Sequence, residues 1–181
     1  MSKESKLGCG FPNAMFRNMP AFYKIPQTCT VVLHHNRNEV PMLRAKFPNM
    51  RILMRAYTPN WTREPAVAWA RSIAQWMNEL RQFGVVDVTF ANEQNLVVEG
   101  HPDGAPYQGT EYPPQSVYEN IRDWNLDVIQ ELRIQIPWAV IHFPALSQGH
   151  SDDSNDVGYV GFEILRPAVE ACDVLDVHTY Y

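Results

Sequence analysis

The chain has 181 residues, of which 45% are hydrophobic and 12% aromatic, and its formal net charge is −5. This length allows one compact domain with a sizeable core. The mild charge and the lack of a basic stripe argue against a nucleic-acid-binding protein, and no apolar run approaches the length of a membrane span.

Residues 1–8 are charged and polar and are predicted to form a tail. No apolar segment follows them, so the sequence shows no signal peptide, and a cytoplasmic location is the default expectation. The three cysteines are widely spaced and form no Cys-x-x-Cys motif. They therefore indicate neither a disulfide framework nor a zinc ribbon.

Strand-like and helical segments alternate along the chain. Strands are predicted at 28–33, 50–57, 85–91, 138–143 and 174–181, with a possible first strand near 8–13. Helices are predicted at 14–24, 41–47, 62–83, 115–133 and 157–171, the last of them broken or restarted at Pro167. Alternation of this kind, with nearly continuous apolar strands, predicts an α/β fold with a parallel sheet buried on both faces.

Polar side chains gather where the predicted strands end. They are His34, His35, Asn36, the segment 55–60, Asn92, Glu93, His142, His178 and Tyr180. In a parallel α/β fold the carboxyl ends of all strands share one edge, which is where such folds bind ligands. No glycine-rich phosphate fingerprint accompanies a strand, and this disfavours a nucleotide site.

The stretch 85–95 is the most informative. A strand-like run rich in valine follows Gly84 and leads into Asn92 and Glu93. Residues 96–114, with three glycines and four prolines, then form a long irregular loop. Loops of this length are more often functional than idle. Two interpretations stand side by side: Glu93 is a proton-transferring carboxyl group, or it belongs to a solvated turn.

These residues resemble the motifs of the (β/α)8-barrel retaining glycosidases that include cellulases, mannanases and β-galactosidases. Those enzymes carry Asn-Glu at the end of strand four, usually followed by proline, and here Asn92-Glu93 is followed by Gln94. Many also carry His-x-Tyr at the end of strand six, matched here by His178 and Tyr180. The resemblance extends over most of the chain in layout but depends on two short motifs.

The resemblance implies a TIM-barrel type of fold, truncated after strand six, with residues 1–181 forming one incomplete barrel domain. A full barrel takes about 250 residues. The second carboxylate of the family, the nucleophile at the end of strand seven, would lie beyond Tyr181. Glu111, Glu163 and Glu170 are not credible substitutes, because the first lies in the long loop and the others in the last helical stretch.

The implied activity is retaining hydrolysis of a β-linked oligo- or polysaccharide. In this reaction one carboxyl group protonates the leaving oxygen, and a second lies about 5 Å away. The resemblance makes Glu93 the acid/base, Asn92 a sugar-orienting residue, and His178 and Tyr180 cleft residues. No cofactor and no metal is implied.

Five further residues are candidates for substrate binding. Arg55 could bind substrate or form a structural ion pair, and Tyr57 and Trp61 could stack on a sugar or pack in the core. His142 ends the fifth predicted strand, and His35 could face the cleft. Strand alternation sends His34 and His35 to opposite sides, so a shared metal is not expected.

Two other classes compete with the glycosidase interpretation. One is a non-catalytic carbohydrate-binding or structural barrel domain that kept the polar edge and lost the chemistry. The other is a barrel enzyme of aldolase type, which would need a lysine or metal-binding carboxylates at strand ends. Lys24 and Lys46 do not lie at strand ends. A serine hydrolase is disfavoured because no Gly-x-Ser-x-Gly motif is present.

Overall fold

A computed structural model describes the chain at residues 8–11, 28–32, 37–104, 113–146 and 157–176. Three of the predicted site residues, His35, His178 and Tyr180, lie outside the described residues, as does the predicted helix at 14–24.

The strands form one parallel sheet whose spatial order follows the chain, from β1 to β6. They are β1 (Gly8–Phe11), β2 (Thr28–Val32), β3 (Arg51–Arg55), β4 (Asp87–Thr89), β5 (Val140–Phe143) and β6 (Val174–Leu175). Each corresponds to a segment that the sequence predicted, although β4 and β6 are shorter than expected. The fold is therefore a mixed α/β fold with a parallel sheet.

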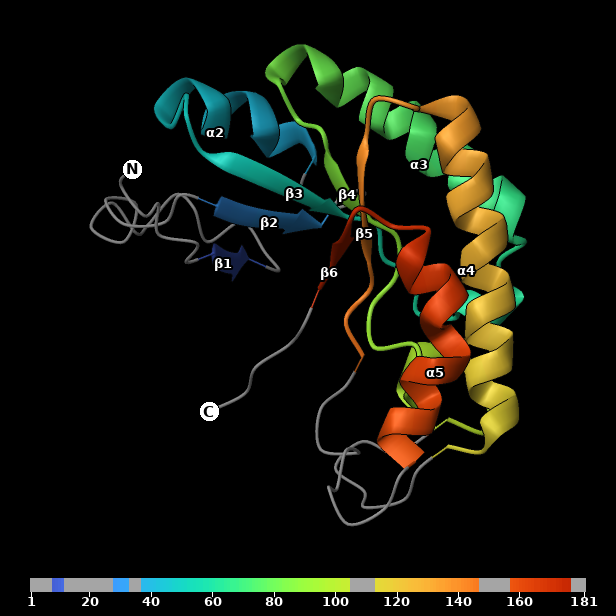
Figure 1. Cartoon of the computed structure of the whole chain (residues 1–181). Coiled ribbons are helices and arrows are strands. Elements are labelled where there is room, and N and C mark those ends of the chain that lie inside the picture. The colour runs from blue at the N-terminus through green and yellow to red at the C-terminus, as the bar shows by residue number, and fades with distance from the viewer. Residues whose placement is uncertain (1–7, 12–27, 33–36, 105–112, 147–156, 177–181) are drawn as a thin grey trace.

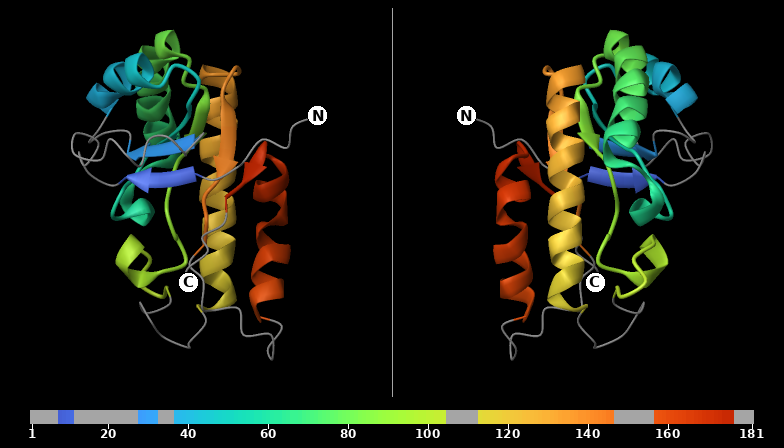
Figure 2. Two further views of the ribbon diagram at one scale, coloured as in Figure 1. Left: turned by 90° about the vertical axis from the view of Figure 1, so that its left-hand side faces the viewer. Right: turned by 90° about the vertical axis from the view of Figure 1, so that its right-hand side faces the viewer.

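The helices connect successive strands. They are α2 (Val40–Lys46), α3 (Ala66–Leu80), α4 (Gln115–Gln135) and α5 (Val157–Glu170), with 3₁₀ turns η3 (Arg37–Glu39), η4 (Trp61–Arg63), η5 (Arg81–Phe83) and η6 (Val97–Glu99). Right-handed crossovers between strands in sequential order place every helix on the same face of a sheet. Figure 1 shows α3, α4 and α5 along one side, and the left view of Figure 2 faces the other side of the sheet.

The core fills the space between the helices and the outer face of the sheet. Ile52 and Met54 of β3 point into it, as do Val88 of β4 and Ile141 of β5. The alternate positions point to the opposite, inner face, where Arg51 is exposed. Asp87, Thr89 and His142 on the inner face are nevertheless buried, so the expected burial on both faces holds at β4 and β5, while the expectation of nearly continuous apolar strands is wrong at these polar positions.

Two predictions about where helices end can be compared with the structure. The C-terminal stop predicted at Gly84 is confirmed, since this glycine adopts the left-handed conformation with a φ of 69° just after α3 and η5. The predicted break at Pro167 is wrong, because α5 continues through it to Glu170. Pro167 lies in the last turn, where a missing backbone N–H removes only one hydrogen bond.

None of the helices in the described ranges is both long enough and apolar enough to cross a membrane.

Candidate functional site

Two polar groups lie on neighbouring strands, one within the sheet and one beyond its C-terminal edge. We call Arg51, Asp87, His142 and Asp176 the inner-face quartet. We call Arg55, Tyr57, Asn92, Glu93 and Glu99 the edge cluster.

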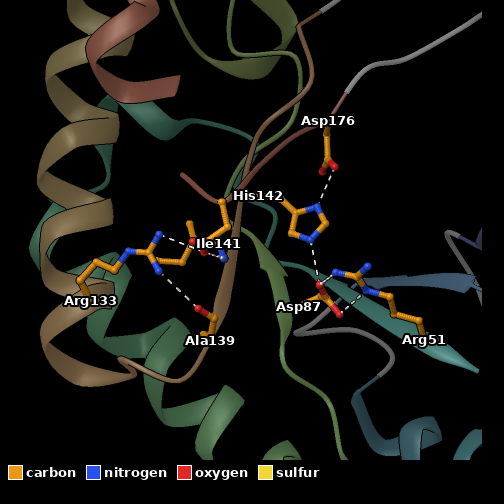
Figure 3. Close-up of polar contacts among 8 residues, drawn as sticks. Arg51, Asp87, Arg133, Ala139, Ile141, His142 and Asp176 are labelled. Atoms are coloured by element: carbon orange, nitrogen blue, oxygen red, sulfur yellow. Dashed lines mark hydrogen bonds and ion pairs between the residues drawn. The ribbon is translucent and has the colours of Figure 1, made fainter. Parts of the chain in front are cut away.

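The inner-face quartet spans β3, β4, β5 and the residue after β6 (Figure 3). His142 Nε2 lies 3.0 Å from Asp87 Oδ1, and Nδ1 lies 2.8 Å from Asp176 Oδ1. Arg51 donates to both oxygens of Asp87, with Nε 2.8 Å from Oδ2. Both ring nitrogens of His142 are thus engaged within the protein.

Charge pairing sets the protonation of this quartet. Burial alone would lower the pKa of His142, but the hydrogen bonds and charges of Asp176 and Asp87 outweigh it and raise the pKa to about 9. Burial would raise the pKa of Asp87, yet Arg51 and His142 hold it below its usual range. At neutral pH the quartet therefore carries two positive and two negative charges.

The edge cluster begins where β3 and β4 end. Arg55 Nη1 donates to Asn92 Oδ1 at 2.9 Å, and Asn92 Nδ2 donates to Glu99 Oε1 at 2.9 Å. A carboxamide has two N–H donors and two acceptor lone pairs. Beyond these two hydrogen bonds, Asn92 thus keeps one donor and one acceptor, and its side chain is partly exposed.

Glu93 takes an unusual backbone conformation beside Asn92. Its φ is 35°, and it is the one residue other than glycine with a positive φ in the described ranges. Such conformations are strained for a side chain of this size and occur disproportionately at functional sites. The Glu93 N–H donates to Ala145 O at 2.9 Å, joining the ends of β4 and β5, and the residue is 7% exposed. It is not a fully solvated turn.

Glu99 completes the cluster from η6, where it is 8% exposed. Burial raises its pKa most, hydrogen bonding to Asn92 opposes the rise, and the charge of Glu93 adds to it. Arg55 and Tyr57 lower it in part. The pKa of Tyr57 is raised, chiefly by burial and then by the charge of Glu99 and a hydrogen bond to it. The ionisation of Tyr57 and that of Glu99 therefore influence each other.

The predicted site residues within the described ranges lie in three different places. Trp61 is 2% exposed, donates from Nε1 to Gln94 O at 3.2 Å and packs against the rings of His101 and Trp124. This position favours the core-packing alternative over sugar stacking. His142 belongs to the inner-face quartet, one layer below the edge. Arg55, Tyr57, Asn92 and Glu93 are brought together.

Glu99 is the residue that sequence reasoning missed. The signal available was the long loop after Glu93, but nothing in its composition distinguished Glu99 from Glu111. Within the described parts of the chain, no group of three or more His, Cys, Asp or Glu side chains is arranged to hold a metal ion.

Comparison with known proteins gives a distant structural likeness. No family model matches the sequence, and no curated protein matches it. Among solved structures, the chain is similar to the arginine decarboxylase of Paramecium bursaria Chlorella virus, with 10% identity and a TM-score of 0.44. The match covers 84% of this chain and 39% of that protein, so the chain spans less than half of its length. A likeness at this level supports no functional argument.

These comparisons overturn the predicted membership of the retaining glycosidases. They provide no evidence for a glycoside hydrolase, and the distant likeness described above is to a protein of another class, so the assignment of the chain as a probable glycosidase is wrong. The physical reason is that Asn-Glu and His-x-Tyr are short motifs. A strand that leads into a polar corner can produce the first of them without the second carboxylate that hydrolysis needs.

Proposed function

We propose that the chain is a non-catalytic carbohydrate-binding domain of barrel-type α/β architecture, and that its edge cluster binds a hydroxyl-rich oligo- or polysaccharide. The supporting observation is the hydrogen-bonding state of Asn92, whose amide is held at both ends and still offers one donor and one acceptor. Neighbouring hydroxyl groups of a sugar present a matching acceptor and donor.

The charges of the cluster favour a neutral ligand. Arg55 would repel a cation, and the carboxyl groups of Glu93 and Glu99 would repel a phosphate or carboxylate. Donors and acceptors of both kinds, held by the protein before the ligand arrives, suit an uncharged ligand with many hydroxyl groups. The strained backbone of Glu93 fits such a preorganised site.

The sequential strand order supports the barrel-type part of the proposal. Strands that follow one another around a single sheet, with all helices outside, make up the wall of a (β/α)8 barrel. The C-terminal edge of such a wall carries the binding site in barrel proteins. The edge cluster lies at that edge, directly after β3 and β4.

Isothermal titration calorimetry with the 181-residue chain tests this function. The probes are soluble hexasaccharides of β-linked glucose, mannose and xylose. We expect one of them to bind, and Asn92→Ala to weaken binding about 5-fold or more, since each ligand hydrogen bond contributes about 1 kcal/mol. Asn78→Ala, on the exposed side of α3, is the control and should leave binding unchanged. Equal binding by both variants would exclude the edge cluster as the site.

A further inference from the structure

Glu99 is held in place by a tightly folded turn. Within that turn, the Leu96 N–H donates to Glu93 O at 2.9 Å, and the Glu99 N–H donates to Leu96 O at 3.1 Å. The following residue, Gly100, accepts from Thr62 Oγ1 at 2.7 Å, which fastens η6 to η4. These bonds fix the backbone of Glu99, and its carboxyl group is held at Asn92 by the hydrogen bond to Oε1.

Gly100 explains why the turn packs so closely. Its φ is 110°, and a Cβ atom at this position would lie 2.5 Å from Asn60 Cα. A side chain is excluded both by the conformation and by the neighbouring backbone. The close approach brings η6 against the segment after β3 and turns Glu99 inward, while Val97 and Val98 remain exposed.

The Glu99 carboxyl group meets charged or polar groups from each surrounding element. Arg55 comes from the end of β3, Tyr57 from the segment after it, and Asn92 and Glu93 from the end of β4. One oxygen, Oε1, accepts from Asn92 Nδ2. The other, Oε2, is buried without a close hydrogen-bond partner in the described residues, while Tyr57 interacts with the same carboxyl group. Because this oxygen is buried, the protonation state of Glu99 changes the hydrogen bonds that the neighbouring side chains can form.

We propose that Glu99 is a positioning residue of the binding site, which orients the Asn92 amide and sets whether Tyr57 donates its hydroxyl proton to the ligand. This inference rests on the proposed function. When Glu99 is ionised, Oε1 accepts from Asn92, and the carboxylate attracts the Tyr57 O–H, which is then used within the protein. When Glu99 is protonated, its own O–H donates to the Tyr57 oxygen, and the Tyr57 proton is available to the ligand.

The direction of the pH dependence follows from this arrangement. Burial, reinforced by the charge of Glu93, raises the pKa of Glu99, so the protonated form persists to a higher pH than for an ordinary glutamate. The protonated form offers the ligand one more donor. Affinity should therefore be highest below the pKa of Glu99 and fall as the pH rises through it.

Nuclear magnetic resonance of the free 181-residue chain tests the positioning role without any ligand. The side-chain carboxyl carbon of Glu99 and the side-chain amide of Asn92 are followed from pH 4 to 9. We expect the two to titrate together, and Glu99→Gln to abolish the titration at Asn92. Glu79→Gln, at an exposed site on α3, is the control and should preserve it. An Asn92 amide that does not titrate, or that keeps titrating in the Glu99→Gln variant, would overturn the inference.

Binding of the three hexasaccharides then measures the consequence for the ligand. Glutamine keeps an acceptor for Asn92 and a donor for Tyr57, so Glu99→Gln should retain the affinity of the low-pH wild type and lose its pH dependence. Glu99→Ala should weaken binding about 5-fold or more. Binding of the Glu99→Gln variant that still falls with rising pH would also contradict the inference. If no hexasaccharide binds any variant, the proposed function is wrong, and the free-protein titration alone decides the role of Glu99.

Discussion

The inner-face quartet and the edge cluster are built from similar side chains, but they differ in how many of their hydrogen-bonding atoms are left unused by the protein. In the quartet, His142 uses both ring nitrogens and Asp87 uses both oxygens within the protein. In the edge cluster, Asn92 uses half of its hydrogen-bonding capacity, and Oε2 of Glu99 lacks a close partner in the described residues.

The difference follows from where each group lies. Adjacent strands in register hold Asp87 and His142 at a fixed separation, so their charges can be paired completely. Residues beyond the strand ends are placed by turns, whose backbone can be shaped to leave donors and acceptors unused. We infer that the quartet mainly stabilises the sheet and that the edge cluster mainly serves binding. The two regions should therefore respond differently to substitution.

The largest expected effect is that of Asp87→Ala. Its side chain is 2% exposed, and its removal leaves the charged His142 without a buried partner. We expect the free energy of unfolding, measured by urea denaturation, to fall by about 3 to 5 kcal/mol. Asp176→Ala is the matched control. Its partner is the same histidine, but its side chain is 24% exposed, so the loss should be about 1 to 2 kcal/mol. A similar small loss in both variants would show that burial does not decide the role of Asp87.

The next effect is the dependence of stability on alkaline pH. The pKa of His142 rises from 6.5 to about 9 on folding. A raised folded-state pKa stabilises the protein fully below pH 6.5, and this stabilisation is lost as the pH rises towards 9. The expected loss is about 3 kcal/mol between pH 6 and 9.5.

Urea denaturation of the His142→Gln variant provides the control for this pH effect. The variant should be less stable at pH 6 and should lose most of the dependence on alkaline pH. A wild-type stability that is flat between pH 6 and 9.5 would show that His142 gains no proton on folding.

A smaller effect separates two glycines with positive φ. In Gly100→Ala a Cβ atom would meet backbone at 2.5 Å, whereas in Gly84→Ala the nearest atom lies 3.9 Å away at the end of the flexible Arg44 side chain. Both variants incur the conformational cost of about 1 kcal/mol, and Gly100→Ala adds a steric cost, for a total of about 2 to 3 kcal/mol. Thermal unfolding measures the loss of stability in both variants. Equal decreases in the melting temperature would mean that η6 adapts freely and does not hold Glu99 in place.

The smallest effect is that of Glu93→Gly. Glycine relieves the strain at a φ of 35°, which offsets part of what is lost with the buried side chain. We expect the free energy of unfolding to change by less than about 1 kcal/mol. Glu93→Ala, which removes the side chain but keeps the strain, is the control and should be clearly less stable. If the alanine variant is as stable as the glycine variant, the positive φ costs little.

Sequence patterns predicted the strands, the main helices and the edge on which polar residues gather. Apolar strands and a helix ended by Gly84 are local features, and each element depends mostly on residues within it. The pairing of Arg55 with Asn92 depends on two strands lying side by side in register, which residue spacing alone does not give.

Other features could not be predicted because they arise from tertiary contacts. Glu99 turns inward because Gly100 packs against Asn60, a contact between residues that are far apart in the sequence. The burial of Trp61 depends on Trp124 of α4 in the same way. The family assignment failed for a different reason, since two short motifs say little about chemistry that requires a second carboxylate.

The most direct test of the central claim is to map ligand binding by ¹⁵N–¹H nuclear magnetic resonance, using the hexasaccharide with the highest affinity. We predict that the side-chain amide of Asn92 and the backbone amides of Tyr57 and Glu93 shift on binding. The side chain of His142, one layer below, should keep its resonances. Shifts confined to residues away from the edge cluster, or the absence of any shift at saturating hexasaccharide, would contradict the proposal that this edge binds carbohydrate.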